Sequence, residues 1–208
     1  TILKLIERFY DVDSGVVLVN GCDIRQLSQA SLRAALGYVP QKSYLFSGTI
    51  DTNVAYGRES MPESHVEEAL ALAQASQFVL EKPEGASQPI SQGGTNVSGG
   101  QRQRLCIARA LAKEAQGYLF DDSFSALDYK TDAALRQRLA TELPQATKII
   151  VAQRIASIRE ADTIVVLKDG VVSGVGTHAS LLEGCEQYRK IALSQLSEEE
   201  LGMTGGAQ

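Results

Sequence analysis

Two stretches of the sequence carry residues that could bind or act on a phosphate. The first is Ser98-Gly99-Gly100-Gln101, which stands before a run rich in Gln, Arg, Leu and Ala that predicts a helix over Gln101–Lys113. Bare glycine backbone and free N–H groups at a helix start favour an anion. The stretch therefore predicts a phosphate-binding helix start, although a serine there also suits an ordinary helix cap.

The second stretch is an apolar run, Tyr118-Leu119-Phe120, that ends in the acids Asp121 and Asp122. Such a run is typical of a buried parallel strand, and open α/β sheets place ligands at the carboxyl ends of their strands. A hard cation beside phosphates needs an oxygen anion on a rigid support. Asp121 is therefore a candidate Mg²⁺ ligand, although an isolated Asp-Asp pair also suits a solvated turn.

Taken together, Ser98–Arg104, Asp121-Asp122 and Ser125-Ala126-Leu127-Asp128 resemble the signature motif, Walker B motif and D-loop of ABC-type ATPases. They occur in the family's order and spacing, and the resemblance covers nearly the whole chain. It implies an α/β fold with a P-loop NTPase-like (RecA-like) core sheet and an inserted helical lobe. It also implies ATP and Mg²⁺ as cofactors and ATP hydrolysis as the reaction.

The resemblance gives roles to further residues. Gln41, which follows Pro40, corresponds to the Q-loop glutamine that reaches Mg²⁺ and the attacking water. Ser98, Gly99, Gly100 and Gln101 correspond to the signature residues that bind a nucleotide held by a second subunit, with Ser98 and Gly100 contacting its γ-phosphate. Asp128 corresponds to the D-loop acid that organises the interface between the two subunits.

Two positions depart from the family's pattern. Members that hydrolyse ATP efficiently carry Glu after the Walker B Asp, whereas this chain has Asp122, whose carboxylate is one methylene shorter. A displacement of roughly 1 Å can cost on the order of a hundredfold in rate. The family's switch histidine is replaced by Gln153, which can donate a hydrogen bond but cannot carry a proton. Both changes predict a site that binds ATP and hydrolyses it poorly.

The intact signature stretch and the two departures together suit one half of a heterodimer of ABC subunits.

No Gly-x-x-x-x-Gly-Lys-Ser/Thr motif occurs in the 208 residues, and Thr1 begins a segment with the pattern of an amphipathic helix. In the family a phosphate loop precedes such a helix, so Thr1 corresponds to the residue just after its Mg²⁺-binding hydroxyl. We therefore expect a phosphate loop and a transmembrane domain upstream of Thr1.

Composition narrows the class of protein. Hydrophobic residues at 44% and charged residues at 22% suit a globular domain, and 208 residues suffice for one core, alone or with a smaller lobe. The net charge of -5 argues against a nucleic-acid surface. The three cysteines have neither paired nor metal-like spacing, and no apolar run approaches the roughly 18 residues of a membrane span.

The sequence pattern also predicts the elements that position these motifs, within a single ABC ATP-binding domain over 1–208. The core lobe is expected at 1–49 and 115–196, the helical lobe at about 50–114 and a flexible tail at 197–208. Helices are predicted over Thr1–Phe9, Ser28–Ala34, parts of Ile50–Leu80, Tyr129–Leu143, His178–Glu183 and Cys185–Leu196. Strands are predicted over Val16–Val19, Gly37–Val39, Thr147–Ala152 (as a buried strand), Asp162–Leu167 and Val171–Val175, with hairpin turns at Asn20-Gly21 and Lys168-Asp169-Gly170 and a loop over Lys82–Asn96.

The segment Leu45–Ile50 is similar to that of exporter-type members, in which this surface meets the coupling helices of the membrane domain. Exposed Leu and Phe in a loop indicate a partner surface, and burial within the helical lobe is the alternative. The resemblance thus implies an ABC exporter subunit at the cytoplasmic face of the plasma membrane. Two alternatives remain open: a regulatory nucleotide-binding module with little turnover, and a soluble ABC ATPase outside transport.

Overall fold

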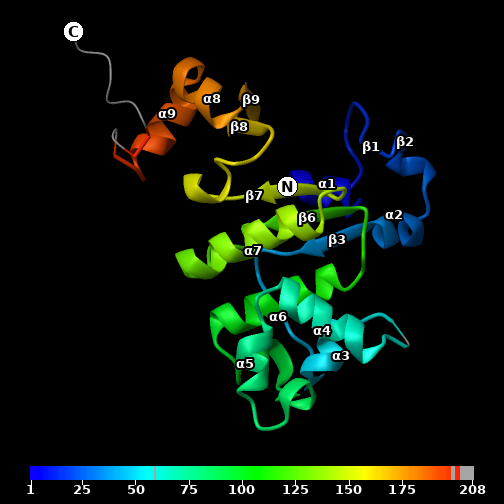
Figure 1. The fold of residues 1–208 in the computed structure, drawn as a ribbon. Coiled ribbons are helices and arrows are strands. Elements are labelled where there is room, and N and C mark those ends of the chain that lie inside the picture. The colour runs from blue at the N-terminus through cyan, green and yellow to red at the C-terminus, as the bar shows by residue number, and fades with distance from the viewer. Residues whose placement is uncertain (59, 198–199, 202–208) are drawn as a thin grey trace. The chain divides into compact units, whose positions relative to one another are not determined.

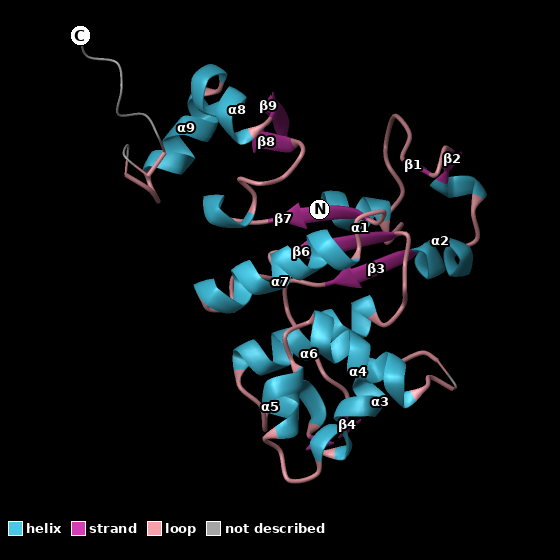
Figure 2. Ribbon diagram, in the orientation of Figure 1, coloured by secondary structure: helices cyan, strands magenta, loops and turns pink. Residues whose placement is uncertain are grey.

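The computed structural model describes residues 1–58, 60–197 and 200–201 of the chain. It divides into two compact units, Thr1–Val151 and Ala152–Gln208, each with its own buried cluster of apolar side chains. Both contain helices and strands, coloured from blue to red along the chain in Figure 1 and by type in Figure 2.

The first unit carries most of the secondary structure. Its helices are α1 (Ile2–Ile6), α2 (Gln29–Ala35), α3 (Ile50–Val54), α4 (Glu63–Leu72), α5 (Ser76–Leu80), α6 (Gly99–Leu111) and α7 (Tyr129–Glu142). Its strands are β1 (Leu18–Val19), β2 (Cys22–Asp23), β3 (Leu36–Val39), β4 (Gly48–Thr49), β5 (Pro89–Ile90), β6 (Gly117–Asp121) and β7 (Thr147–Val151). Short 3₁₀ turns lie at Ile24–Gln26, Gly85–Ser87 and Gln92–Gly94.

A parallel sheet of three strands, in the order β3-β6-β7, organises this unit. The central strand β6 is buried from Gly117 to Phe120, and its last residue Asp121 is half-buried. Because parallel strands end at the same edge, the residues after β3 and β6 meet there. The predicted acid-ended strand is confirmed, and its acids lie at the ligand-binding edge that the fold class favours.

The helices α3, α4, α5 and α6 gather on one side of this sheet (Figure 1). Apolar side chains of the helices and the sheet form one continuous cluster, which includes Leu105 and Ile107 of α6 and Tyr118 and Phe120 of β6. The helix that begins at the signature stretch is therefore packed directly onto the strand that ends in the acids. The predicted boundaries of the core and helical lobes stay a prediction.

The second unit is built around a hairpin of β8 (Ile164–Lys168) and β9 (Val171–Gly176), joined at Asp169-Gly170 as predicted. A 3₁₀ turn at Ile155–Ser157 precedes it, and α8 (His178–Gly184) and α9 (Glu186–Leu193) follow. Positive φ angles at Asp169 and Gly170, 50° and 80°, explain the turn, because Asp and Gly tolerate the left-handed conformation. Asn20 and Gly21, at 51° and 77°, form the other predicted hairpin turn in the same way.

Several local predictions need correction. The prediction of a buried strand at Thr147–Ala152 is wrong, because β7 lies at the edge of the sheet, with Ile149 37% and Val151 43% exposed. Helix α1 ends at Ile6 rather than Phe9, and the Lys82–Asn96 loop contains β5 and two 3₁₀ turns. Of the expected tail, 198–199 and 202–208 lie outside the described residues, while Leu201 is buried in the second unit.

Candidate functional site

The acidic edge of the sheet is held by a tyrosine of the neighbouring strand. The Tyr38 hydroxyl in β3 donates to Asp121 Oδ2 at 3.3 Å. Burial, together with the neighbouring Asp121 carboxylate, raises the pKa of Tyr38 to about 12, so the hydroxyl stays protonated at neutral pH. It fixes one carboxylate oxygen of Asp121 and leaves the other available to a ligand.

Asp122 lies in the turn that follows β6. Its φ of 48° is left-handed, which Asp tolerates better than most residues, and its N–H donates to the Val151 carbonyl at 2.9 Å. The Gln41 side-chain amide donates to Asp122 Oδ2 at 3.4 Å, a long bond that draws the two side chains together. The structure thus brings Gln41, Asp121 and Asp122 to one edge of the sheet.

Two serines fix the turn that carries these acids. Ser123 is fully buried, and its hydroxyl donates to the Val39 carbonyl at 3.0 Å. The Ser125 hydroxyl donates to the Asp122 carbonyl at 2.9 Å. Because Val39 ends β3 just before Gln41, the Ser123 bond ties the turn after β6 to the glutamine loop.

The predicted phosphate-binding helix start is a capping box. Ser98 Oγ accepts from the Gln101 N–H, and Gln101 Oε1 accepts from the Ser98 N–H, both at 3.2 Å. Gly99 has open space where a side chain would stand, and a Cβ on Gly100 would meet only the Ala126 carbonyl, at 3.5 Å. The first turn of α6 therefore presents bare backbone. The ordinary cap is present and leaves the backbone of the first turn open, while anion binding there stays a prediction.

The remaining predicted residues are Asp128, Thr1 and Gln153. Asp128 caps α7 by accepting from the Thr131 N–H and hydroxyl at 2.9 and 2.7 Å, and these bonds lower the pKa of its carboxyl. Thr1 begins α1 without a side-chain cap bond. Gln153 belongs to the second unit, where its carbonyl accepts from the Gln195 side chain at 2.7 Å.

Sequence reasoning missed a buried polar network behind the glutamine loop. Asn53 in α3 is 1% exposed; its side chain bonds the Phe46 N–H, the Phe46 and Thr49 carbonyls and Arg109 Nη2. Arg109 in α6 also donates to the Asn53 and Tyr44 carbonyls at 2.8 and 2.9 Å. The network ties the segment after Gln41 to the helix of the signature stretch. The sequence signal was a polar residue beside apolar neighbours: Asn53 precedes Val54, and Arg109 stands between Ala108 and Ala110.

The Leu45–Ile50 segment is divided between the core and the surface. Leu45 and Ile50 are fully buried, so the expectation of an exposed Leu is wrong. Phe46 is 37% exposed and stacks on Tyr56, with ring centroids 4.3 Å apart. The Arg109 guanidinium lies 5.2 and 5.7 Å from these two ring centroids. Phe46 is therefore the only apolar side chain of this segment that remains available to a partner, beside the exposed Ser47 and Gly48.

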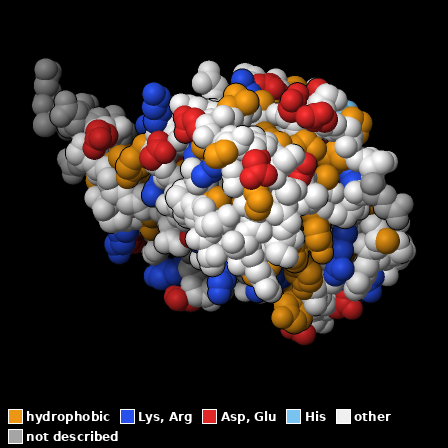
Figure 3. All heavy atoms as spheres, turned by 90° about the horizontal axis from the view of Figure 1, so that it is seen from below, with side chains coloured by type: hydrophobic (Ala, Val, Ile, Leu, Met, Phe, Trp, Pro, Cys, Tyr) orange, Lys and Arg blue, Asp and Glu red, His pale blue; other side chains and the backbone are white. Residues whose placement is uncertain are grey.

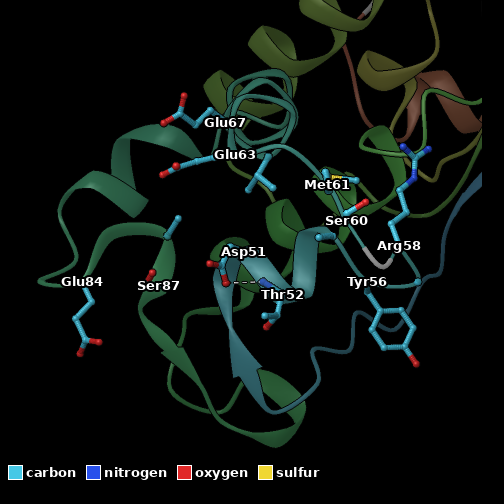
Figure 4. Close-up of a pocket in the computed structure, with 14 residues that line it drawn as sticks. Asp51, Thr52, Tyr56, Arg58, Ser60, Met61, Glu63, Glu67, Glu84 and Ser87 are labelled. Carbon is cyan, nitrogen blue, oxygen red and sulfur yellow. Dashed lines mark hydrogen bonds between the residues drawn. The ribbon is translucent and has the colours of Figure 1, made fainter.

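A separate hollow of about 750 Å³ lies beside α3 and the start of α4. Figure 4 shows the acids Asp51, Glu63, Glu67 and Glu84 around it. None of the predicted site residues lines this hollow. From the direction of Figure 3, acidic, basic and hydrophobic side chains are interspersed, without one dominant charge.

Two further features concern metals and membranes. Within residues 1–58, 60–197 and 200–201, no three His, Cys, Asp or Glu side chains are grouped to hold a metal. Any Mg²⁺ at Asp121 would therefore take its remaining ligands from water and from a phosphate. No helix among those residues is long and apolar enough to cross a membrane.

Comparison with known proteins agrees with this geometry. A family model described as ABC transporter matches residues 1–125. An uncharacterised ABC transporter ATP-binding protein of Mycobacterium tuberculosis is 44% identical, in an alignment that covers 99% of this chain and 35% of that protein. The ATP-dependent lipid A-core flippase of Escherichia coli is 38% identical over 95% of this chain and 34% of its own length.

A solved structure has the same fold. A bacterial Atm1-family ABC exporter with ATP bound superimposes with a TM-score of 0.89 at 38% identity, over 93% of this chain and 34% of that one. The chain thus spans about a third of the length of these relatives. The acid-ended strand, the capped signature helix and these matches lead to one assignment: the chain belongs to the ABC transporter family and has the α/β fold of its ATP-binding domains.

Proposed function

We propose that this chain is the ATP-binding domain of an ABC exporter at the cytoplasmic face of the plasma membrane, working beside a transmembrane domain and a second ABC subunit. In this arrangement ATP-driven dimerisation of two such domains powers transport. The similarity to an ATP-bound exporter and to lipid A-core flippases supports the assignment. The partly exposed aromatic pair Phe46 and Tyr56 offers a surface for the membrane domain.

The observation that carries the proposal is the edge where Gln41, Asp121 and Asp122 meet. Asp121 would hold Mg²⁺ through water, and Mg²⁺ would neutralise charge on the phosphates. Gln41 would orient the attacking water. Asp122 would stand where a general base is needed, but its carboxylate already accepts from Gln41 and is one methylene short of a Glu.

We further propose that this chain's own site hydrolyses ATP poorly, whereas its signature stretch completes a competent site on a different subunit. Gln153 supports the first half, because an amide cannot accept and return a proton at the γ-phosphate. The bare first turn of α6 supports the second half, because Ser98, Gly99 and Gly100 leave room for a phosphate against the backbone. The two subunits would then form a heterodimer.

The test compares two variants in the full-length protein with its wild-type partner, by steady-state ATPase and transport. Gly100→Asp puts a carboxylate where the partner's γ-phosphate must approach and should reduce turnover by roughly 100-fold, as when one transition-state donor is removed. Asp122→Asn should cost no more than about twofold, because this carboxylate is not the main base of the assembly.

Two controls separate folding from chemistry. Gly100→Ala should fold normally, because its Cβ meets the nearest atom at an ordinary contact distance of 3.5 Å. Asp122→Glu combined with Gln153→His should raise turnover at the weak site, since both changes restore transition-state groups. Equal losses from Gly100→Asp and Asp122→Asn would instead indicate two equivalent sites, and absence of turnover in the wild-type dimer would indicate a regulatory module.

A further inference from the structure

A second cavity, of about 470 Å³, lies between the helical region and the start of α7. Its walls come from the end of α4, from α5, from α6 and from the first turns of α7. The volume is within the usual range of small-molecule sites. None of the residues of the acidic edge, Gln41, Asp121 or Asp122, lines it, so it is distinct from the proposed hydrolytic site.

The charges around this cavity have a sign opposite to that of the chain. Three cationic side chains line it, Arg104, Lys130 and Arg138, and one acid does, Asp128. The lining therefore carries a formal charge of about +2, whereas the whole chain carries -5. The Asp128 carboxylate already accepts two bonds from Thr131 as the cap of α7, so it is not directed to the cations by a hydrogen bond.

Arg104 is the central observation. Its side chain is half-buried, and Nη1 donates to the Gln74 carbonyl at 2.7 Å while the guanidinium stands 4.7 Å from the Phe78 ring centroid. Its Nε is buried without a hydrogen-bond partner. Among the described residues no carboxylate lies within 4.0 Å of this guanidinium. Burial lowers the pKa of Arg104, and the negative charge of nearby Asp128 offsets part of that shift.

Lys130 and Arg138 are also accessible to a ligand in the cavity. Lys130 is exposed on the first turn of α7 and forms no ion pair within the described ranges. Arg138, two turns further along α7, pairs with Glu142 at 3.4 Å, and both side chains are more than 40% exposed. An exposed pair of this kind is readily exchanged for another anion.

We propose that this cavity is an anion site that takes a phosphate-bearing small molecule, held by Arg104, Lys130 and Arg138. A phosphate offers several acceptor oxygens, and guanidinium groups bind such oxygens in pairs. The cavity adjoins the start of α7, where the Asp128 carboxylate opposes a bound phosphate, so the three cations must outweigh this one acid. The proposal does not depend on transport or on hydrolysis by the neighbouring site.

The experiment titrates the 208-residue chain with pyrophosphate at low ionic strength, by calorimetry and by amide chemical shifts. The sequence has no Gly-x-x-x-x-Gly-Lys-Ser/Thr loop to compete for the probe, and binding at the first turn of α6 would instead shift the amides of Gly99 and Gly100. Binding should shift the amides of Gln74, Lys130 and Thr131 and should weaken as salt screens the charges. Lys130→Gln and Arg138→Gln should each weaken binding about fivefold, and Arg104→Lys should weaken it while keeping the charge.

The matched control is Lys168→Gln, which removes the same charge from an exposed lysine outside the cavity and should leave the affinity unchanged. Two further arms, ATP and vesicles containing phosphatidic acid, distinguish a soluble ligand from a lipid headgroup. Binding of either probe that is weakened by Lys130→Gln and not by Lys168→Gln supports the phosphate site. The probe that binds then identifies the ligand as a soluble phosphate compound or a lipid headgroup. The proposal is overturned if no probe binds at low salt, or if Lys168→Gln weakens binding as much as Lys130→Gln.

Discussion

Replacing Asn53 with alanine tests whether the buried network holds the segment after Gln41 in place. Four hydrogen bonds between 2.7 and 2.9 Å would be lost, from the Phe46 N–H, to the Phe46 and Thr49 carbonyls, and from Arg109. A net hydrogen bond contributes about 1 kcal/mol, and groups left buried without a partner add to the loss. Arg109 keeps two carbonyl partners, and this limits the loss of stability. We expect the free energy of unfolding to fall by about 3–5 kcal/mol.

The measurement is urea unfolding followed by circular dichroism, since the chain has no tryptophan. The matched control is Asn96→Ala: Asn96 is exposed and forms two bonds, with the Ser91 N–H and the Pro89 carbonyl. It should cost about 1 kcal/mol. Asn53→Asp keeps the acceptor and loses both donors, so its loss of unfolding free energy should lie between those of Asn53→Ala and Asn96→Ala. A loss from Asn53→Ala no larger than that from Asn96→Ala would refute the reasoning.

Three further predictions concern packing, pH and nucleotide binding. Gly37→Ala places a Cβ 2.6 Å from the buried Tyr118 ring and should lower the free energy of unfolding by about 1–3 kcal/mol in the same assay; an unchanged midpoint would contradict this. Burial and the charge of Arg159 hold the pKa of His178 below 6.5, so the stability it contributes is present above pH 6.5 and is lost as pH falls through the folded pKa. His178→Phe should therefore flatten the decline in stability at acid pH, and an equal slope in variant and wild type would argue against it. The 208-residue chain, lacking a phosphate-loop motif, should bind ATP weakly without appreciable hydrolysis, and micromolar affinity by calorimetry would exclude this.

The features that local chemistry determines were predictable from the sequence. Asn20-Gly21 and Asp169-Gly170 form their turns because those residue types tolerate positive φ, whatever surrounds them. Ser98 starts α6 because its side chain meets the N–H of Gln101, three residues along. The apolar run before Asp121 could only be buried, and its acids had to lie at a strand end.

The features that depend on distant segments were not predictable. The contact between Tyr38 and Asp121 needs the parallel pairing of β3 and β6, which are separated by more than seventy residues. Residues of β7 have the composition of a buried strand, but burial depends on what covers the strand. Leu45 and Phe46 are adjacent apolar residues, and only the packing of α3 and α6 decides which one enters the core.

The caps of α6 and α7 differ in a way that bears on selectivity. The Ser98 hydroxyl accepts a hydrogen bond from the Gln101 N–H and still has its own proton to donate. Ser98 can therefore cap the helix and donate to an anion at the same time. Asp128, by contrast, already supplies the negative charge that the start of α7 attracts. Exchanging the two cap residues would preserve both helices and reverse their preference for charge. A Ser cap and an Asp cap hold the helix backbone in the same way. The identity of the cap residue thus decides whether a helix start favours an anion or a cation.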